Sequence, residues 1–158
     1  PDRHDVNNRY KWSNTGTAAD GNAYTDFLFN LNAGSGFAGH SDWRLPVVSE
    51  LQSILVGPGV TTVSTDVDPA DPAMGPNSMG PSSICGSAPC IDPGFAAIGG
   101  PTASDTHWSS SSLLLFPTFG WVADFGSVGG DTVFSRFKTF DLFGNGAVRA
   151  VRAGSCFD

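Results

Sequence analysis

The sequence predicts an α+β fold in which two helices pack on a small, mainly antiparallel sheet. Apolar residues recur at helical spacing twice before residue 57, and strand-like segments separated by short turns follow residue 105. Residues 57–105 carry no sustained period. The chain has 158 residues, the length of one ordinary domain, and its 20 Gly and 11 Pro exclude a helical bundle. We therefore expect a single domain over residues 1–158, with residues 57–105 as a long irregular insertion.

The N-terminal part predicts one short strand followed by two helices. Residues 9–13 (RYKWS) have the aromatic content and alternation of a strand. A helix then begins at Asn22, because four apolar positions recur at roughly 3.6-residue spacing: Ala23, Phe27, Leu28 and Leu31. A second helix is expected over residues 47–56. Pro46 suits its first turn, and the Gly-Pro pair at residues 57–58 ends it.

The C-terminal third predicts an antiparallel meander. Its expected strands are residues 106–111 (THWSSS), 120–125 (GWVADF), 132–143 (TVFSRFKTFDLF) and 147–153 (AVRAVRA). The connections at residues 126–131 (GSVGGD) and 144–146 (GNG) suit hairpin turns, because Gly and Asn tolerate positive φ.

The charge of the chain excludes two classes of partner. Its net charge is −7, and its eight Lys and Arg residues form no basic stripe that would follow a phosphate backbone or an anionic bilayer. Its longest aliphatic or aromatic run, residues 113–116, is far shorter than the roughly 20 residues that cross a bilayer. We expect neither a nucleic-acid partner nor membrane insertion.

Five short blocks stand in an order and at a spacing that resemble a known family. They are residues 39–46 (GHSDWRLP), 49–54 (SELQSI), 107–111 (HWSSS), 121–125 (WVADF) and 148–152 (VRAVR). Together they resemble the Lcl C-terminal domain family, named for a collagen-like adhesin of Legionella and found in bacterial secreted and surface proteins. The resemblance covers residues 10–154. It implies a C-type lectin-like fold, related to formylglycine-generating enzymes, and an extracellular or cell-surface domain that binds carbohydrate or a cell-surface protein.

The family-like blocks are expected to be scaffold. Their large apolar residues should form the core: Trp43, Leu45, Trp108, Trp121 and Phe125. Arg44, Arg149 and Arg152 lie within apolar segments, where a buried guanidinium needs a carboxylate. The expected carboxylates are those of Asp42, Glu50 and Asp124. Function is therefore sought in the loops.

The cysteines predict a disulfide and an oxidising, extracellular compartment. Cys85 and Cys90 lie close together in a Pro-, Gly- and Ser-rich loop, which favours a structural disulfide. Cys156 is then a free thiol, pairs with another subunit, or competes for one of the other two. The spacing of Cys85 and Cys90 also resembles the reactive pair of formylglycine-generating enzymes. That pair, however, lies near the C-terminal end of those domains rather than in a central insertion.

Other chemistry has little support in the sequence. The Ser run at residues 109–112 follows His107 without a nucleophile elbow or an orienting acid, so we expect no enzyme. Asp66, Asp68 and Asp71 offer the oxygen ligands that calcium accepts, although they also suit a series of Asp-Pro turns. The dispersed His and Cys residues lack the close ligand pairs of a zinc site.

The aromatic loops provide the candidate contact residues. Phe137, Phe140 and Phe143 recur every three residues, so strand alternation cannot turn all of them inward. The expected ligand or interface residues are Phe116, Phe119, Phe140, Asp141, Phe143 and Asn145. The alternatives are a second small core under the insertion, and the interface of a structural subunit in an extracellular homo-oligomer or filament. If the ligand is a glycan, the net charge favours a neutral one over a sulfated one.

Overall fold

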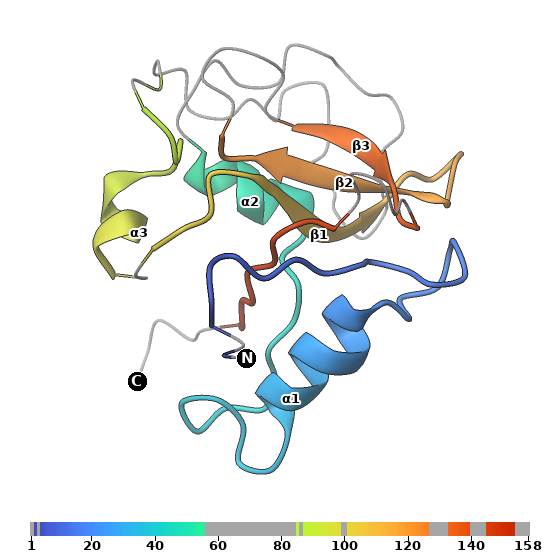
Figure 1. The fold of residues 1–158 in the computed structure, drawn as a ribbon, viewed down its shortest axis with the longest axis horizontal. Coiled ribbons are helices and arrows are strands. Elements are labelled where there is room, and N and C mark those ends of the chain that lie inside the picture. The colour runs from blue at the N-terminus through green and yellow to red at the C-terminus, as the bar shows by residue number, and fades with distance from the viewer. Residues whose placement is uncertain are drawn as a thin grey trace.

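A three-stranded antiparallel sheet with the order β1-β2-β3 forms the centre of the fold (Figure 1). The computed structural model describes residues 2, 4–55, 85, 87–98, 101–126, 133–139 and 145–153. The strands are β1 (Thr106–Ser112), β2 (Phe119–Asp124) and β3 (Val133–Phe137). The sequence prediction of an α+β chain is therefore confirmed, and so is the antiparallel order of the first three predicted strands after residue 105.

Apolar clusters cover both faces of the sheet, and successive side chains of β2 point alternately into one cluster and the other. Trp121 and Ala123 pack against helix α2 (Val48–Ile54), which lies across one face of β1 and β2 (Figure 1). Val122 points to the other face, as does its register partner Trp108, and both pack against residues of the N-terminal segment. A central strand buried on both sides accounts for the nearly continuous apolar run of β2.

The two predicted helices are present with small changes. The first begins as a π-helix, η1 (Ala23–Leu28), and continues as α1 (Phe29–Asn32), with Phe27, Leu28 and Leu31 buried. Helix α2 starts where the Val47 N–H donates to the Glu50 carboxylate at 2.8 Å. This contact is one half of a capping box.

The serines of β1 have structural roles. The Ser109 hydroxyl donates to the Trp121 carbonyl at 2.7 Å, and the Ser111 hydroxyl accepts the Val48 N–H at 3.0 Å. The Ser109 carbonyl in turn accepts the indole N–H of Trp12 at 2.8 Å. These bonds tie β1 to β2, to helix α2 and to the N-terminal segment.

Two predicted strands are reduced to isolated pairs. In residues 9–13 only Tyr10 pairs, with Gly146, because the Lys11 N–H bonds instead to the Asn22 side chain at 2.5 Å. In residues 147–153 the backbone leaves β1 after Ala147 and pairs next at Val151, with Arg44. The Asn22 side chain in the first segment, and the change of partner from β1 to Arg44 in the second, thus prevent a continuous strand pairing.

Two further expectations were too simple. Strand β3 ends at Phe137, before a turn at residues 138–139, whereas the sequence predicted a strand to residue 143. The insertion at residues 57–105 contains helix α3 (Pro93–Ile98), and Ile91 within it pairs with Leu55.

Most of the predicted core is buried, but the arginines are not. Trp108, Trp121, Phe125 and Leu45 are buried, and Trp43 is only half-buried. The exposed Arg44 forms an ion pair with Glu50 at 2.7 Å, and the half-buried Arg152 pairs with Asp42 at 3.2 Å. The long arginine stems run over the surface and keep their charged ends near water.

Arg149 and Asp124 do not follow the predicted pairing. Arg149 donates to the Thr102 hydroxyl at 2.8 Å, and Asp124 accepts the Gly126 N–H at 2.8 Å. Among the described residues, no helix has both the length and the apolar content needed to cross a membrane.

Candidate functional site

The connection between β1 and β2 is a tight apolar hairpin. The Phe119 N–H donates to the Phe116 carbonyl at 2.8 Å, and Pro117 occupies the second position of this turn, which its fixed φ favours. The Leu113 N–H closes the hairpin by donating to the Phe119 carbonyl at 3.1 Å. The turn therefore holds residues 114–116 out beyond the end of the sheet.

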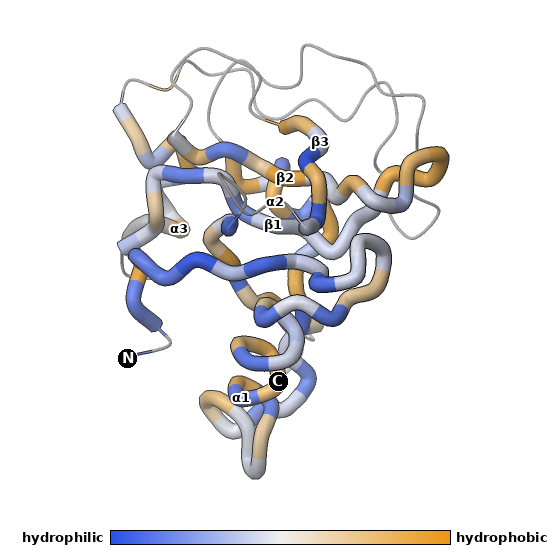
Figure 2. The backbone as a smooth tube through the Cα atoms, turned by 45° about the vertical axis from the view of Figure 1, so that its right-hand side comes forward, coloured by the Kyte–Doolittle hydropathy of each residue, from blue (hydrophilic) through white to orange (hydrophobic). Residues whose placement is uncertain are grey.

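The tip of this hairpin exposes large apolar side chains. Leu115 is 72% exposed, Phe116 is 60% exposed and Leu114 is 58% exposed. Figure 2 shows the same segment as a hydrophobic loop that projects from the sheet beside β2 and β3. No residue between positions 113 and 119 carries a charge.

The aromatic rings extend this surface onto β3. Phe119 lies directly opposite Phe137 in the strand register, with ring centroids 3.9 Å apart. Phe116 meets Phe119 edge to face at 6.5 Å, and Phe137 is itself 45% exposed. We call this surface the hairpin patch, formed by Leu114, Leu115, Phe116, Phe119 and Phe137.

The structure brings two of the predicted contact residues, Phe116 and Phe119, into the hairpin patch. Asn145 is exposed next to Gly146, which pairs with Tyr10 and not with the hairpin. Phe140, Asp141 and Phe143 lie outside the described residues. So do Cys156 and the three predicted calcium ligands Asp66, Asp68 and Asp71. Within the described part of the chain, no three His, Cys, Asp or Glu side chains are close enough to hold a metal ion.

A second surface, which the sequence did not indicate, is a groove between helix α1 and residues 43–45. Its volume is about 610 Å³, and its aromatic walls are Tyr24, Phe29 and Trp43. Phe29 is 67% exposed, while the Asn32 amide fixes Trp43 through two 2.8 Å bonds to the Trp43 backbone. We call this surface the aromatic groove. The only sequence signal for it is an apolar Phe on the outer side of the first helix.

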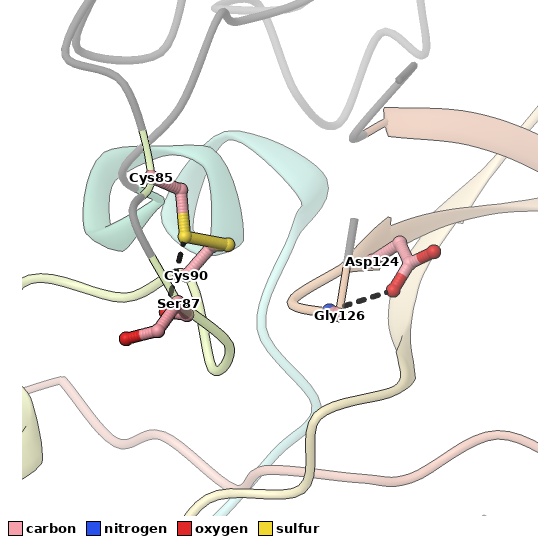
Figure 3. The surroundings of a disulfide bond; sticks show 5 residues. All are labelled: Cys85, Ser87, Cys90, Asp124 and Gly126. Atoms are coloured by element: carbon pink, nitrogen blue, oxygen red, sulfur yellow. Dashed lines mark hydrogen bonds between the residues drawn. A yellow bond between two sulfur atoms is a disulfide. The ribbon is translucent and has the colours of Figure 1, made fainter. Parts of the chain in front are cut away.

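The predicted disulfide between Cys85 and Cys90 is present, with the two Cα atoms 5.5 Å apart (Figure 3). It closes a loop beside the end of β2, where the Cys90 N–H donates to the Phe125 carbonyl at 2.7 Å. Both cysteines are buried. Their bonded state and their place against the core describe a structural staple.

These features define a small α+β domain with an exposed apolar hairpin, an aromatic groove and a disulfide-closed loop. Comparison of the chain with protein-family models, with curated proteins and with solved structures finds no match.

Proposed function

We propose that the chain is a non-enzymatic binding domain that works outside the cell or at the cell surface and adheres to a cell-surface ligand through the hairpin patch. The observation that carries this proposal is the exposure of Leu114, Leu115 and Phe116 together on one uncharged turn. Contiguous apolar surface of this kind marks binding sites on soluble domains. Fully burying one such side chain is worth roughly 1.5–3 kcal/mol, so a few of them can anchor a partner.

The same proposal includes an extracellular compartment and membership of a protein family. The disulfide between Cys85 and Cys90 suits an oxidising compartment, as a secreted bacterial domain would meet. The five family-like blocks support membership of the Lcl C-terminal domain family and its C-type lectin-like fold. In the structure these blocks contribute buried residues such as Trp108 and Val122, as expected for scaffold.

The two surfaces favour different ligands. The hairpin patch offers few directed hydrogen-bonding side chains, so a protein surface is its better partner. The aromatic groove sets Trp43 and Phe29 beside the polar side chains of Asn32, Arg44 and Ser110, which suits a carbohydrate. A net charge of −7 favours a neutral glycan there.

A second candidate function is that of a structural subunit in an extracellular homo-oligomer or filament. It is favoured by the composition of the hairpin patch, because exposed Leu and Phe side chains resemble the apolar centre of a homodimer interface. A patch that met a different surface of the next copy would build an open fibre.

The test compares the double variant Leu115→Ser, Phe116→Ser with Phe29→Ser, a matched control that removes an exposed Phe from the aromatic groove. Binding to cells and to a panel of neutral glycans is measured for each, together with the native mass by sedimentation. We expect the hairpin variant to lose cell binding at least tenfold and to keep the wild-type melting temperature.

Each outcome separates the alternatives. Loss of binding only in Phe29→Ser would move the site to the aromatic groove. A wild-type polymer that the hairpin variant reduces to monomers would favour the structural subunit. Equal binding by all three proteins would refute the assignment of the hairpin patch.

A further inference from the structure

A cavity of about 160 Å³ lies near the first residues of β1, whereas the hairpin patch lies beyond its last residue. Five separate parts of the chain line it: residues 4–10, Phe27 of η1, residues 101–103, His107 of β1 and residues 147–149. The side chains that matter for its chemistry are His4, Asp5, Thr102, His107 and Arg149.

His107 presents a hydrogen-bond acceptor to this cavity. Only 2% of the residue is exposed, and its Nδ1 lies 2.9 Å from the Asp105 carbonyl. A carbonyl can only accept, so Nδ1 carries the proton and Nε2 is left with a lone pair. No described residue bonds to Nε2. Burial, aided by the Arg149 charge, lowers the pKa of His107 to about 4, which keeps the ring neutral near pH 7.

Arg149 presents donors and a positive charge to the same cavity. Its Nη1 donates to the Thr102 hydroxyl at 2.8 Å, and no carboxylate in the described ranges forms an ion pair with it. The neighbouring Asp105 is already paired with Arg9 at 2.8 Å. The acid that lines the cavity, Asp5, is exposed and accepts the Asn7 N–H at 2.9 Å. A half-buried guanidinium with free donors is suited to an anion.

We propose that this cavity binds a small oxyanion that retains a hydroxyl proton, of the size of hydrogen phosphate. Arg149 donates to the charged oxygens, and His107 Nε2 accepts the O–H of the ligand. At about 30 Å³ per water in the liquid, the cavity of about 160 Å³ has the volume of about five waters, which is enough for a phosphate ion. Sulfate has the same shape but carries no proton at neutral pH, so one of its oxygens would face the Nε2 lone pair. That repulsion makes the site selective for phosphate.

The experiment is a calorimetric titration of the whole chain at pH 7.5 with inorganic phosphate, with sulfate and with glycerol phosphate. The glycerol phosphate arm separates free phosphate from a phosphate ester, because the ester has a second pKa of about 6 and is mostly unprotonated at this pH. We expect saturable 1:1 binding of phosphate and at least about tenfold weaker binding of sulfate and of the ester.

Two variants and one spectroscopic readout locate the site. Arg149→Gln should weaken phosphate binding at least tenfold. Arg152→Gln, which removes the same charge three residues further along, should leave it unchanged. In the wild-type protein, phosphate should shift the ¹⁵N resonance of His107 Nε2, a signal that does not depend on any variant folding. Absence of phosphate binding, equal binding of sulfate, or an unmoved His107 resonance would each overturn the proposal.

Discussion

Mild acid should destabilise the fold through His107. Its pKa is about 4 in the folded protein, against an ordinary value of about 6.5, mainly because burial disfavours the charged ring. Above pH 6.5 the His107 ring is neutral in both the folded and the unfolded protein, and the free energy of unfolding is not reduced by its titration. As the pH falls toward 4, the unfolded chain takes up a proton that the folded protein does not, so the free energy of unfolding decreases. Linkage then predicts that the free energy of unfolding drops by about 2 kcal/mol between pH 7 and pH 4.5.

Urea unfolding followed by tryptophan fluorescence at constant ionic strength measures this drop. His107→Gln cannot titrate, so its free energy of unfolding should change much less over the same range. Glu50 and Asp42 have pKa values lowered by their arginine partners, and the pKa of Asp20 is lowered to about 2, chiefly by the Asn14 N–H. The stability that these three carboxylates contribute is lost mainly below pH 4.5, outside the range from pH 7 to pH 4.5. Parallel curves for wild type and His107→Gln would refute a buried, neutral His107.

Three other variants test contacts that stabilise the fold. Gly146→Ala should lower the free energy of unfolding by about 1–3 kcal/mol, because a Cβ there would lie 2.8 Å from the fully buried Trp108 ring. A wild-type melting temperature would contradict this. Replacing both Cys85 and Cys90 by Ala should cost about 2 kcal/mol, the loop entropy of a short disulfide, and adding a reductant to wild type should produce the same shift in urea midpoint. Lys138→Met should lower the free energy of unfolding by about 2 kcal/mol in the same assay, because Nζ donates to the Ser112 hydroxyl at 2.6 Å and lies 3.8 Å from the Trp12 ring centroid. An unchanged urea midpoint would show that these contacts do not stabilise the fold.

Elements with a local signal were predictable from the sequence. The helix at Asn22 and the two strands that carry Trp108 and Trp121 have their own periodicity or turn residues, and they appear close to the expected bounds. The strands expected around Tyr10 and Val151 do not form, because distant partners decide their hydrogen bonds. The Asn22 side chain that takes the Lys11 N–H gives no sign of this in the sequence.

The candidate sites divide in the same way. The hairpin patch was partly predictable, because Phe116 and Phe119 flank a Pro-Thr turn within four consecutive residues. The aromatic groove and the cavity were not, since each is assembled from segments far apart in the chain. The burial of Lys138 against Trp12 was not predictable either, because the sequence shows only that it is one of two lysines.

The pairing of Tyr10 with Gly146 has a mechanical consequence. Two backbone bonds of 2.9 and 3.1 Å join residues near opposite ends of the chain, and the segments that carry them run side by side below β1 (Figure 1). A tensile load from the C-terminal side would first meet the pairing of Val151 with Arg44 and that of Ala147 with β1, and then this clamp. While these bonds hold, the hairpin beyond the last residue of β1 lies outside the loaded part of the chain, so a partner bound there would stay in place under flow.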